Sequence, residues 1–97
     1  MDDSTPKHKR PRIASDTFNT QIRHRDRFCL VGLFLKDGTC SEGLDCHHIV
    51  TRGSGGDDVE ENGITLCRYH HNEVGRLGVK FLRSILSYYY GFVYQEN

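Results

Sequence analysis

Two histidine pairs, His47-His48 and His70-His71, are the residues of this sequence best suited to chemistry. A glycine- and acid-rich turn and Asn62 lie between the two pairs. Hydrolysis of a phosphodiester requires a deprotonated water, and a cation that neutralises charge on the phosphate and stabilises the leaving oxygen. Histidine titrates near neutral pH, so one ring of a pair can bind the cation while its neighbour activates the water. The pattern therefore predicts a metal-dependent nuclease site.

Cysteines near the second pair indicate a separate structural metal site. Cys67 and His70 are separated by two residues at the expected start of a helix, a spacing that forms half of many tetrahedral zinc sites. The candidates for the other half are Cys29, Cys40 and Cys46. A zinc ion at Cys46 would crowd a cation at the adjacent His47. We therefore predict zinc ligands Cys29, Cys40, Cys67 and His70, with Cys46 as a buried thiol.

Two alternatives to this zinc site stay open. The gap from Cys29 to Cys40 is longer than in a usual zinc knuckle, so Cys46 can replace either of them. Alternatively, the chain binds no zinc and has four ordinary cysteines.

The size and composition of the chain favour a small metal-stabilised domain. Its 97 residues are 36% hydrophobic, so burial of apolar surface alone leaves a thin stability margin. The sequence has no apolar stretch of membrane-spanning length, and its charged start does not resemble a signal peptide. We therefore expect a reducing cytoplasm, where cysteines bind metals more often than they form disulfides. The formal net charge of +0 argues against a uniformly basic surface that coats nucleic acid.

Hydrophobic patterning and turn residues predict the elements that position these side chains. In chain order we expect a short helix or irregular lead-in over 16–27, a strand over 28–35 interrupted at Gly32, a hairpin that pairs 47–51 with 63–66, and helices over 67–76 and 79–90. The fold class is therefore α+β. A β-hairpin and a helix surround the structural zinc, and an additional C-terminal helix covers the core.

The motif order resembles the HNH endonuclease family. The resemblance rests on His-His-Ile, a Gly-Gly-Asp turn, an asparagine and Leu-Cys-x-x-His-His, and its signature positions are His48, Asn62 and His71. It covers residues 28–78 and is closest to the small zinc-stabilised HNH proteins common in phage genomes. It implies a ββα-metal, treble-clef-like domain that cleaves DNA.

The resemblance also implies a role for each site residue. His48 is expected to be the general base, while His47 and His71 hold a divalent cation. Asn62 is expected to pin the loop through backbone hydrogen bonds and so orient His48, or to touch the metal. Arg52 is expected to contact a phosphate.

One position departs from the family pattern. Gly75 stands where several relatives carry a further histidine, one helical turn after His71. The cation is then held by two or three protein ligands, with water and phosphate oxygens completing its shell. Such a shell suits Mg²⁺ or Mn²⁺.

Basic residues are concentrated in the first third of the chain. We expect residues 1–15 to form a flexible basic arm, or a merely solvated tail, and residues 16–97 to form one nuclease domain. The arginines expected to bind DNA besides Arg52 are Arg23, Arg25 and Arg27. The predicted partner is DNA read with little sequence specificity, because a metal site recognises phosphate rather than base edges.

Two other functions are compatible with the same residues. One is a zinc-stabilised DNA-binding module without catalysis. The other is a nuclease subunit of a larger phage assembly, located in the host cytoplasm. The tyrosine-rich helix over 79–90 also allows a homodimer. The motif leaves open whether one strand, both strands or branched DNA is cut.

Overall fold

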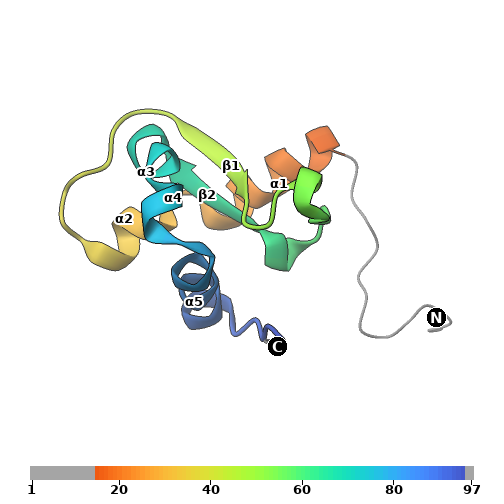
Figure 1. The fold of residues 1–97 in the computed structure, drawn as a ribbon. Coiled ribbons are helices and arrows are strands. Elements are labelled where there is room, and N and C mark those ends of the chain that lie inside the picture. Colours follow the sequence, from red (N-terminus) through yellow and green to blue (C-terminus); the bar gives the residue numbers. More distant parts are fainter. Residues whose placement is uncertain (1–14, 96–97) are drawn as a thin grey trace, which may run out of the picture.

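The computed structural model describes residues 15–95 of the chain (Figure 1). Its elements, in order, are α1 (Ser15–Asp26), α2 (Leu30–Leu35), β1 (Leu44–His48), the 3-10 turns η1 (Arg52–Ser54) and η2 (Glu60–Asn62), β2 (Gly63–Cys67), α3 (Arg68–Asn72), α4 (Val74–Leu77) and α5 (Val79–Tyr90). This arrangement confirms the predicted α+β class. The basic arm expected over 1–15 lies outside the described residues, apart from its last residue, where α1 begins.

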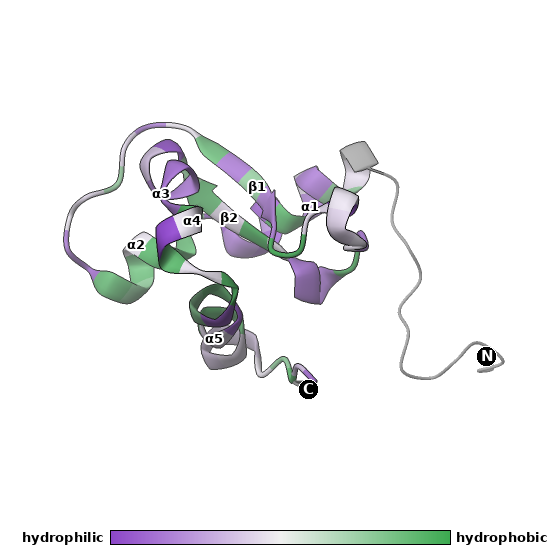
Figure 2. Ribbon diagram, in the orientation of Figure 1, coloured by the Kyte–Doolittle hydropathy of each residue, from purple (hydrophilic) through white to green (hydrophobic). Residues whose placement is uncertain are grey.

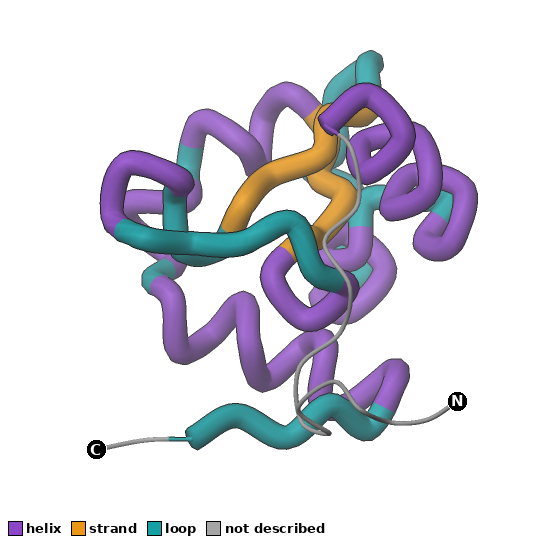
Figure 3. Tube along the Cα trace, turned by 90° about the vertical axis from the view of Figure 1, so that its right-hand side faces the viewer, coloured by secondary structure: helices purple, strands orange, loops and turns teal. Residues whose placement is uncertain are grey.

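A hairpin is present at the centre of the domain, and helical segments surround it (Figure 3), but its first strand covers Leu44–His48 and not the predicted 47–51. β1 and β2 are antiparallel, in a register that runs from Leu44 opposite Cys67 to His48 opposite Gly63. Side chains alternate along a strand, and directly opposed residues share a face. One face therefore carries Asp45, His47, Ile64 and Leu66, and the other carries Cys46, His48, Gly63 and Thr65. The two histidines of the first pair thus leave β1 on opposite faces.

The main hydrophobic core lies on the face of Ile64 and Leu66. Both side chains are fully buried against α2 and α5, where the apolar segments of Figure 2 gather. The helical residues in this core are Leu30, Val31, Leu82, Ile85 and Leu86. α5 spans 79–90 as its apolar spacing predicts, and it ends at Gly91, whose positive φ of 75° suits glycine. No helix of the described residues is long and apolar enough to cross a membrane.

Helix α1 covers the opposite face of the hairpin through buried Phe18 and Ile22. Its last residue, Asp26, is a buried carboxylate that accepts hydrogen bonds from Arg25, from the Thr65 N–H at 2.9 Å and from the Tyr90 hydroxyl at 2.6 Å. These bonds join α1 to β2 and α5. Because every polar contact of Asp26 comes from another segment or a neighbouring side chain, its burial fixes the position of the helix.

Arg25 belongs to the same network, although its charge led us to expect a DNA contact. Its guanidinium donates to the carbonyl oxygens of Glu60 and Gly63, both at 2.8 Å, and it lies 4.6 Å from the centre of the Tyr90 ring. Only 16% of the side chain is exposed. Arg25 is therefore a structural residue of this fold.

Besides the first strand, two predicted elements differ from the structure. Residues 30–35 form helix α2, not a strand, because the side chain of Cys29 caps the helix by accepting the Gly32 N–H. A short apolar run without periodicity does not distinguish the two structures. The helix predicted over 67–76 is divided at Glu73 into α3 and α4.

Candidate metal and catalytic centres

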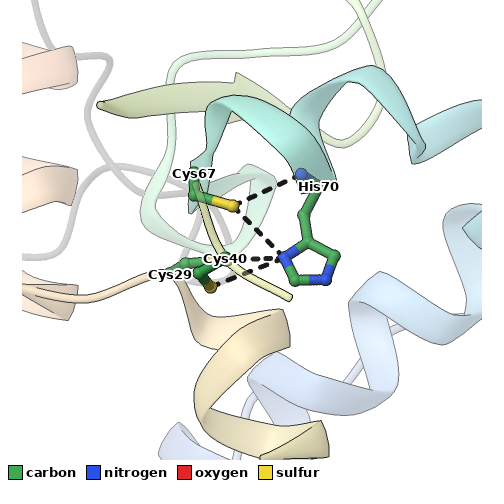
Figure 4. A group of neighbouring side chains, drawn as sticks. All are labelled: Cys29, Cys40, Cys67 and His70. Carbon is green, nitrogen blue, oxygen red and sulfur yellow. Dashed lines mark hydrogen bonds between the residues drawn. The ribbon is translucent and has the colours of Figure 1, made fainter. Parts of the chain in front are cut away.

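Three cysteines and one histidine converge at the start of α3, as predicted (Figure 4). The sulfurs of Cys29 and Cys67 lie 3.3 Å from Nδ1 of His70, and that of Cys40 lies 3.7 Å from it. All four donor atoms are within 4.8 Å of one another. Three thiols and one imidazole are a donor set typical of structural zinc, so this cluster could hold a zinc ion.

The backbone positions this Cys3His cluster through helix caps. Cys29 and Cys67 precede α2 and α3, and each sulfur accepts a hydrogen bond from the first turn of its helix, from Gly32 N–H and His70 N–H respectively. Gly32 is required because a Cβ at this position would collide with the sulfur of Cys40. The glycine that suggested an interrupted strand therefore makes room for a candidate ligand.

The hydrogen bonds of His70 define which of its nitrogens faces the sulfurs. Thr39 donates its hydroxyl to Asp37 at 2.7 Å, so the same oxygen accepts from Nε2 of His70 at 3.0 Å. Nδ1 is then unprotonated and directs its lone pair at the three sulfurs. A ring held from behind in this way is typical of metal-binding histidines.

The thiol groups differ in their acidity. Burial tends to raise the pKa of Cys67, but hydrogen bonds from the backbone N–H groups of His70 and Ser41 outweigh it and lower the pKa to about 6. Cys67 is thus readily available as a thiolate, the form that binds metals. Cys46 lies outside the cluster, on β1, where partial burial raises its pKa to about 11.

The second candidate centre lies where the end of β1 meets α3. The rings of His47 and His71 are 5.2 Å apart between centroids, at an interplanar angle of 62°. Burial, together with the charges of His71 and His48, lowers the pKa of His47 to about 4. His47 is therefore neutral at physiological pH, the state in which imidazole binds a cation.

Asp45 is a member of this centre that the sequence analysis missed. One of its carboxylate oxygens accepts from Nδ1 of His71 at 3.0 Å and from Nε of Arg68 at 2.9 Å. A carboxylate only accepts, so Nδ1 of His71 carries a proton, and in the neutral ring Nε2 keeps its lone pair. The signal was available in the sequence, because Asp45 lies two residues before His47 and so shares its strand face.

His48 lies on the other face of the hairpin, with its ring centroid 5.1 Å from that of Phe18. Its Nε2 lies 2.8 Å from Oδ1 of Asp58. Strand alternation thus separates His48 from the ring pair of His47 and His71. The distance remains short enough for the charge of His48 to lower the pKa of His47.

Asp58 is the second acidic residue that the sequence analysis did not assign. The residue is 3% exposed and accepts from Nε of Arg52 at 3.1 Å as well as from Nη2 of Arg52. Burial would raise its pKa, but hydrogen bonds from His48 and Arg52 outweigh it and lower the pKa below the ordinary value. The Gly-Gly-Asp turn drew attention to this loop, but its side-chain contacts depend on how the loop folds.

Asn62 joins the two ends of that loop. Its side-chain oxygen accepts the Val50 N–H at 2.8 Å, and its amide donates to the carbonyls of Val50 at 2.9 Å and Asp57 at 3.0 Å. Gly56 permits the close approach, since a Cβ there would overlap the carbonyl of Val50. These are backbone hydrogen bonds of the kind that the family resemblance implies.

The remaining predicted residues lie nearer the surface. Arg27 is exposed, and the side chain of Arg52 is 53% exposed while it contacts Asp58. Arg23 is partly buried, and its charge tends to lower the pKa of Cys46 on β1. Gly75 lies in α4, beyond the break at Glu73, and supplies no ligand atom.

Comparison with protein families matches residues 33–76 to HNH endonuclease. The matched segment contains both strands, the loop between them and α3, and hence both histidine pairs. It excludes α1, Cys29 and all of α5. Comparison with curated proteins and with solved structures gives no match. Residues 33–76 of the chain are therefore similar to the HNH endonuclease family.

Proposed function

We propose that this protein is a metal-dependent endonuclease that hydrolyses phosphodiester bonds of DNA. The observation that carries the proposal is the pairing of His47 from β1 with His71 from α3, 5.2 Å apart, inside the segment matched to the HNH family. One ring is neutral at physiological pH, and the other donates Nδ1–H to Asp45, so Nε2 is its cation-binding nitrogen in the neutral form. Two neutral imidazoles, each with an unprotonated nitrogen, could bind the same divalent cation.

His47 and His71 would hold this cation, Mg²⁺ or Mn²⁺, with no further histidine at Gly75. When bound, such an ion neutralises charge on the phosphate and stabilises the leaving oxygen. His48 would accept the proton of the attacking water. The hydrogen bonds of Asn62 support this assignment, because they tie the loop to the backbone two residues beyond His48.

Asp45 would support the cation site through the nitrogen of His71 that does not bind the cation. Its hydrogen bond to Nδ1 of His71 keeps that ring in the tautomer that binds through Nε2. Arg68 shares the carboxylate and holds it in place.

The Cys3His cluster would bind a structural zinc ion. Its four donors come from the starts of α2 and α3 and from the loop before β1, so one ion would tie these three segments together. This location explains how so small a domain positions its hairpin against α3.

The partner would be DNA bound mainly through its phosphates. Arg27 and Arg52 are the most exposed of the arginines expected to take part, and Arg23 is the third. Contacts of this kind carry little sequence information. They would also make binding strongly dependent on salt concentration.

A plasmid-nicking assay with Mg²⁺ or Mn²⁺ tests the proposal. We expect the wild-type protein to cleave, chelation to abolish cleavage, and His48→Ala to reduce the rate by about 10²- to 10⁴-fold. His24→Ala is the matched control, because His24 is an exposed histidine of α1 outside both centres. Equal cleavage by wild type and His48→Ala would remove His48 from its role. DNA binding without cleavage by the wild type would favour the zinc-stabilised binding module.

A further inference from the structure

Asp58 is a buried carboxylate in the loop between the two strands, and the family signature of two histidines and an asparagine gives it no role. Its side chain is 3% exposed, so its hydrogen-bond partners must come from the protein. Oδ1 lies 2.8 Å from Nε2 of His48 and 3.1 Å from Nε of Arg52, and Oδ2 contacts Nη2 of Arg52. The carboxylate thus lies between the proposed general base and a guanidinium.

We propose that Asp58 is a positioning residue that fixes His48 in the tautomer protonated at Nε2, so that Nδ1 is the nitrogen that accepts the proton of the attacking water. The inference rests on the proposed function of His48. It adds which nitrogen reacts and which residue selects it.

The hydrogen-bonding capacity of the two groups supports this assignment. An ionised carboxylate has no proton to donate, so a 2.8 Å contact with Nε2 requires the proton to be on the imidazole. Among the described residues, no other group hydrogen-bonds the His48 ring. Nδ1 therefore keeps a lone pair without a partner from this part of the protein. The side chain remains 20% exposed, which leaves solvent access to the ring.

The surroundings hold the two side chains in this relationship. Arg52 binds both oxygens of Asp58 and fixes the plane of the carboxylate. Phe18 packs against His48, and the centroids of the two rings are 5.1 Å apart. Asn62 ties Val50 to Asp57, so the backbone just after His48 is fastened to the backbone just before Asp58. The hydrogen bond is thus supported by the backbone of the loop as well as by Arg52.

In the proposed step, His48 takes one proton from the attacking water. The O–H bond of water breaks and an N–H bond forms at Nδ1 of His48. The hydroxide oxygen bonds to phosphorus while the bond from phosphorus to the leaving sugar oxygen breaks, and that oxygen takes a proton from water. His48 is cationic after the transfer, and the negative charge of Asp58 stabilises it until Nδ1 returns its proton to solvent.

Nitrogen NMR of the full-length protein labelled at its histidines tests the inference without requiring activity. At a pH where imidazole is neutral, we expect His48 to show a protonated Nε2 and an unprotonated Nδ1. Asp58→Asn presents an amide that can donate to Nε2, so the tautomer should shift toward protonated Nδ1. Asp58→Glu keeps a carboxylate and should restore the wild-type tautomer at least in part.

Cleavage gives the second measurement. Asp58→Asn should lower the cleavage rate by about 10²- to 10⁴-fold while the melting temperature changes little, and Asp58→Glu should recover part of the rate. Glu42→Gln is the matched control, a carboxylate-to-amide change at an exposed residue outside both centres. It should leave tautomer and rate unchanged.

Two results would overturn the inference. One is a wild-type His48 protonated at Nδ1, which needs no folded variant to observe. The other is an Asp58→Asn protein with unchanged tautomer and unchanged cleavage. A wild type that never cleaves, yet shows the Nε2–H tautomer and its shift in Asp58→Asn, would reject the nuclease proposal and retain the assignment of Asp58.

Discussion

His70 and His71 are adjacent residues of α3, but the two centres to which they belong are built differently. Around His70, four donor atoms from separate segments lie within 4.8 Å of one another. Around His71, two rings are 5.2 Å apart and the nearest carboxylate is hydrogen-bonded to a histidine. The first centre brings together four protein donor atoms, as many as a tetrahedral ion requires, and the second brings together fewer.

This difference follows the distinction between structural and catalytic metal sites. A structural ion needs every position filled by protein, while a catalytic ion needs open positions for water and substrate. In both centres a side chain behind the histidine selects its tautomer, Thr39 for His70 and Asp45 for His71. The centres therefore share the means of orienting a ligand and differ in how many ligands they orient.

Removal of the Cys3His cluster should have the largest effect. Cys67→Ser, or zinc chelation, should unfold the domain, because a structural zinc site contributes about 10 kcal/mol or more, and the net stability of a domain is about 5–15 kcal/mol. Circular dichroism and thermal denaturation measure this. Cys46→Ser is the matched control, since Cys46 lies outside the cluster. Identical melting of the two variants would contradict a structural zinc.

Loss of a ligand at the second centre should affect cation binding and leave the fold intact. His71→Ala removes one of two proposed protein ligands, so Mn²⁺ affinity should fall by at least about 100-fold. Titration calorimetry measures the affinity, and native mass spectrometry checks that zinc content is unchanged. If His71→Ala also lost its zinc, the two centres would not be separable in the way proposed.

Asp45 and Thr39, which hydrogen-bond His71 and His70, allow the two centres to be compared directly. Asp45→Asn should weaken Mn²⁺ binding by about 10- to 100-fold, because an amide can donate to Nδ1 of His71 and favour the wrong tautomer. Thr39→Val should change zinc retention less, since three sulfurs still hold the ion. Competition with a chelator measures how much each variant loses in affinity for its own metal, relative to the wild type. A larger effect at Thr39 would reverse the proposed contrast.

The smallest effect is expected at a contact that belongs to neither centre. Tyr90→Phe deletes the hydroxyl that donates to Asp26 at 2.6 Å and should lower the free energy of unfolding by about 1 kcal/mol, as urea denaturation would show. Tyr88→Phe is the control, because Tyr88 is 71% exposed.

The same hydroxyl gives a pH dependence of known sign. Burial, with the hydrogen bond and charge of Asp26, raises the pKa of Tyr90 to about 12, above the ordinary value of 10. The unfolded chain therefore releases this proton first as the pH rises. The stability that Tyr90 contributes is complete below pH 10 and is lost between pH 10 and about 12. Tyr90→Phe should lose that part of the alkaline dependence.

The sequence was most informative where residue type and spacing alone define an element. Helix α5 follows from its apolar repeat, and the Cys3His set from one Cys-x-x-His pair and the crowding expected beside His47. Helix α2 did not follow, because its apolar run has no period and its cap is a cysteine. Asp45 and Asp58 were missed for a different reason. An acidic residue acquires a role through the histidine it contacts, and those contacts depend on strand register and loop path.

The shortness of α3 has a consequence for the order in which the two proposed metals would bind. Five residues are too few to form a stable helix alone, so the direction of His71 depends on what anchors the preceding residue. An ion at the sulfurs would fix His70 and thereby aim its neighbour toward β1. We expect metallation to be ordered: zinc first, with the second cation bound tightly only by protein already loaded with it.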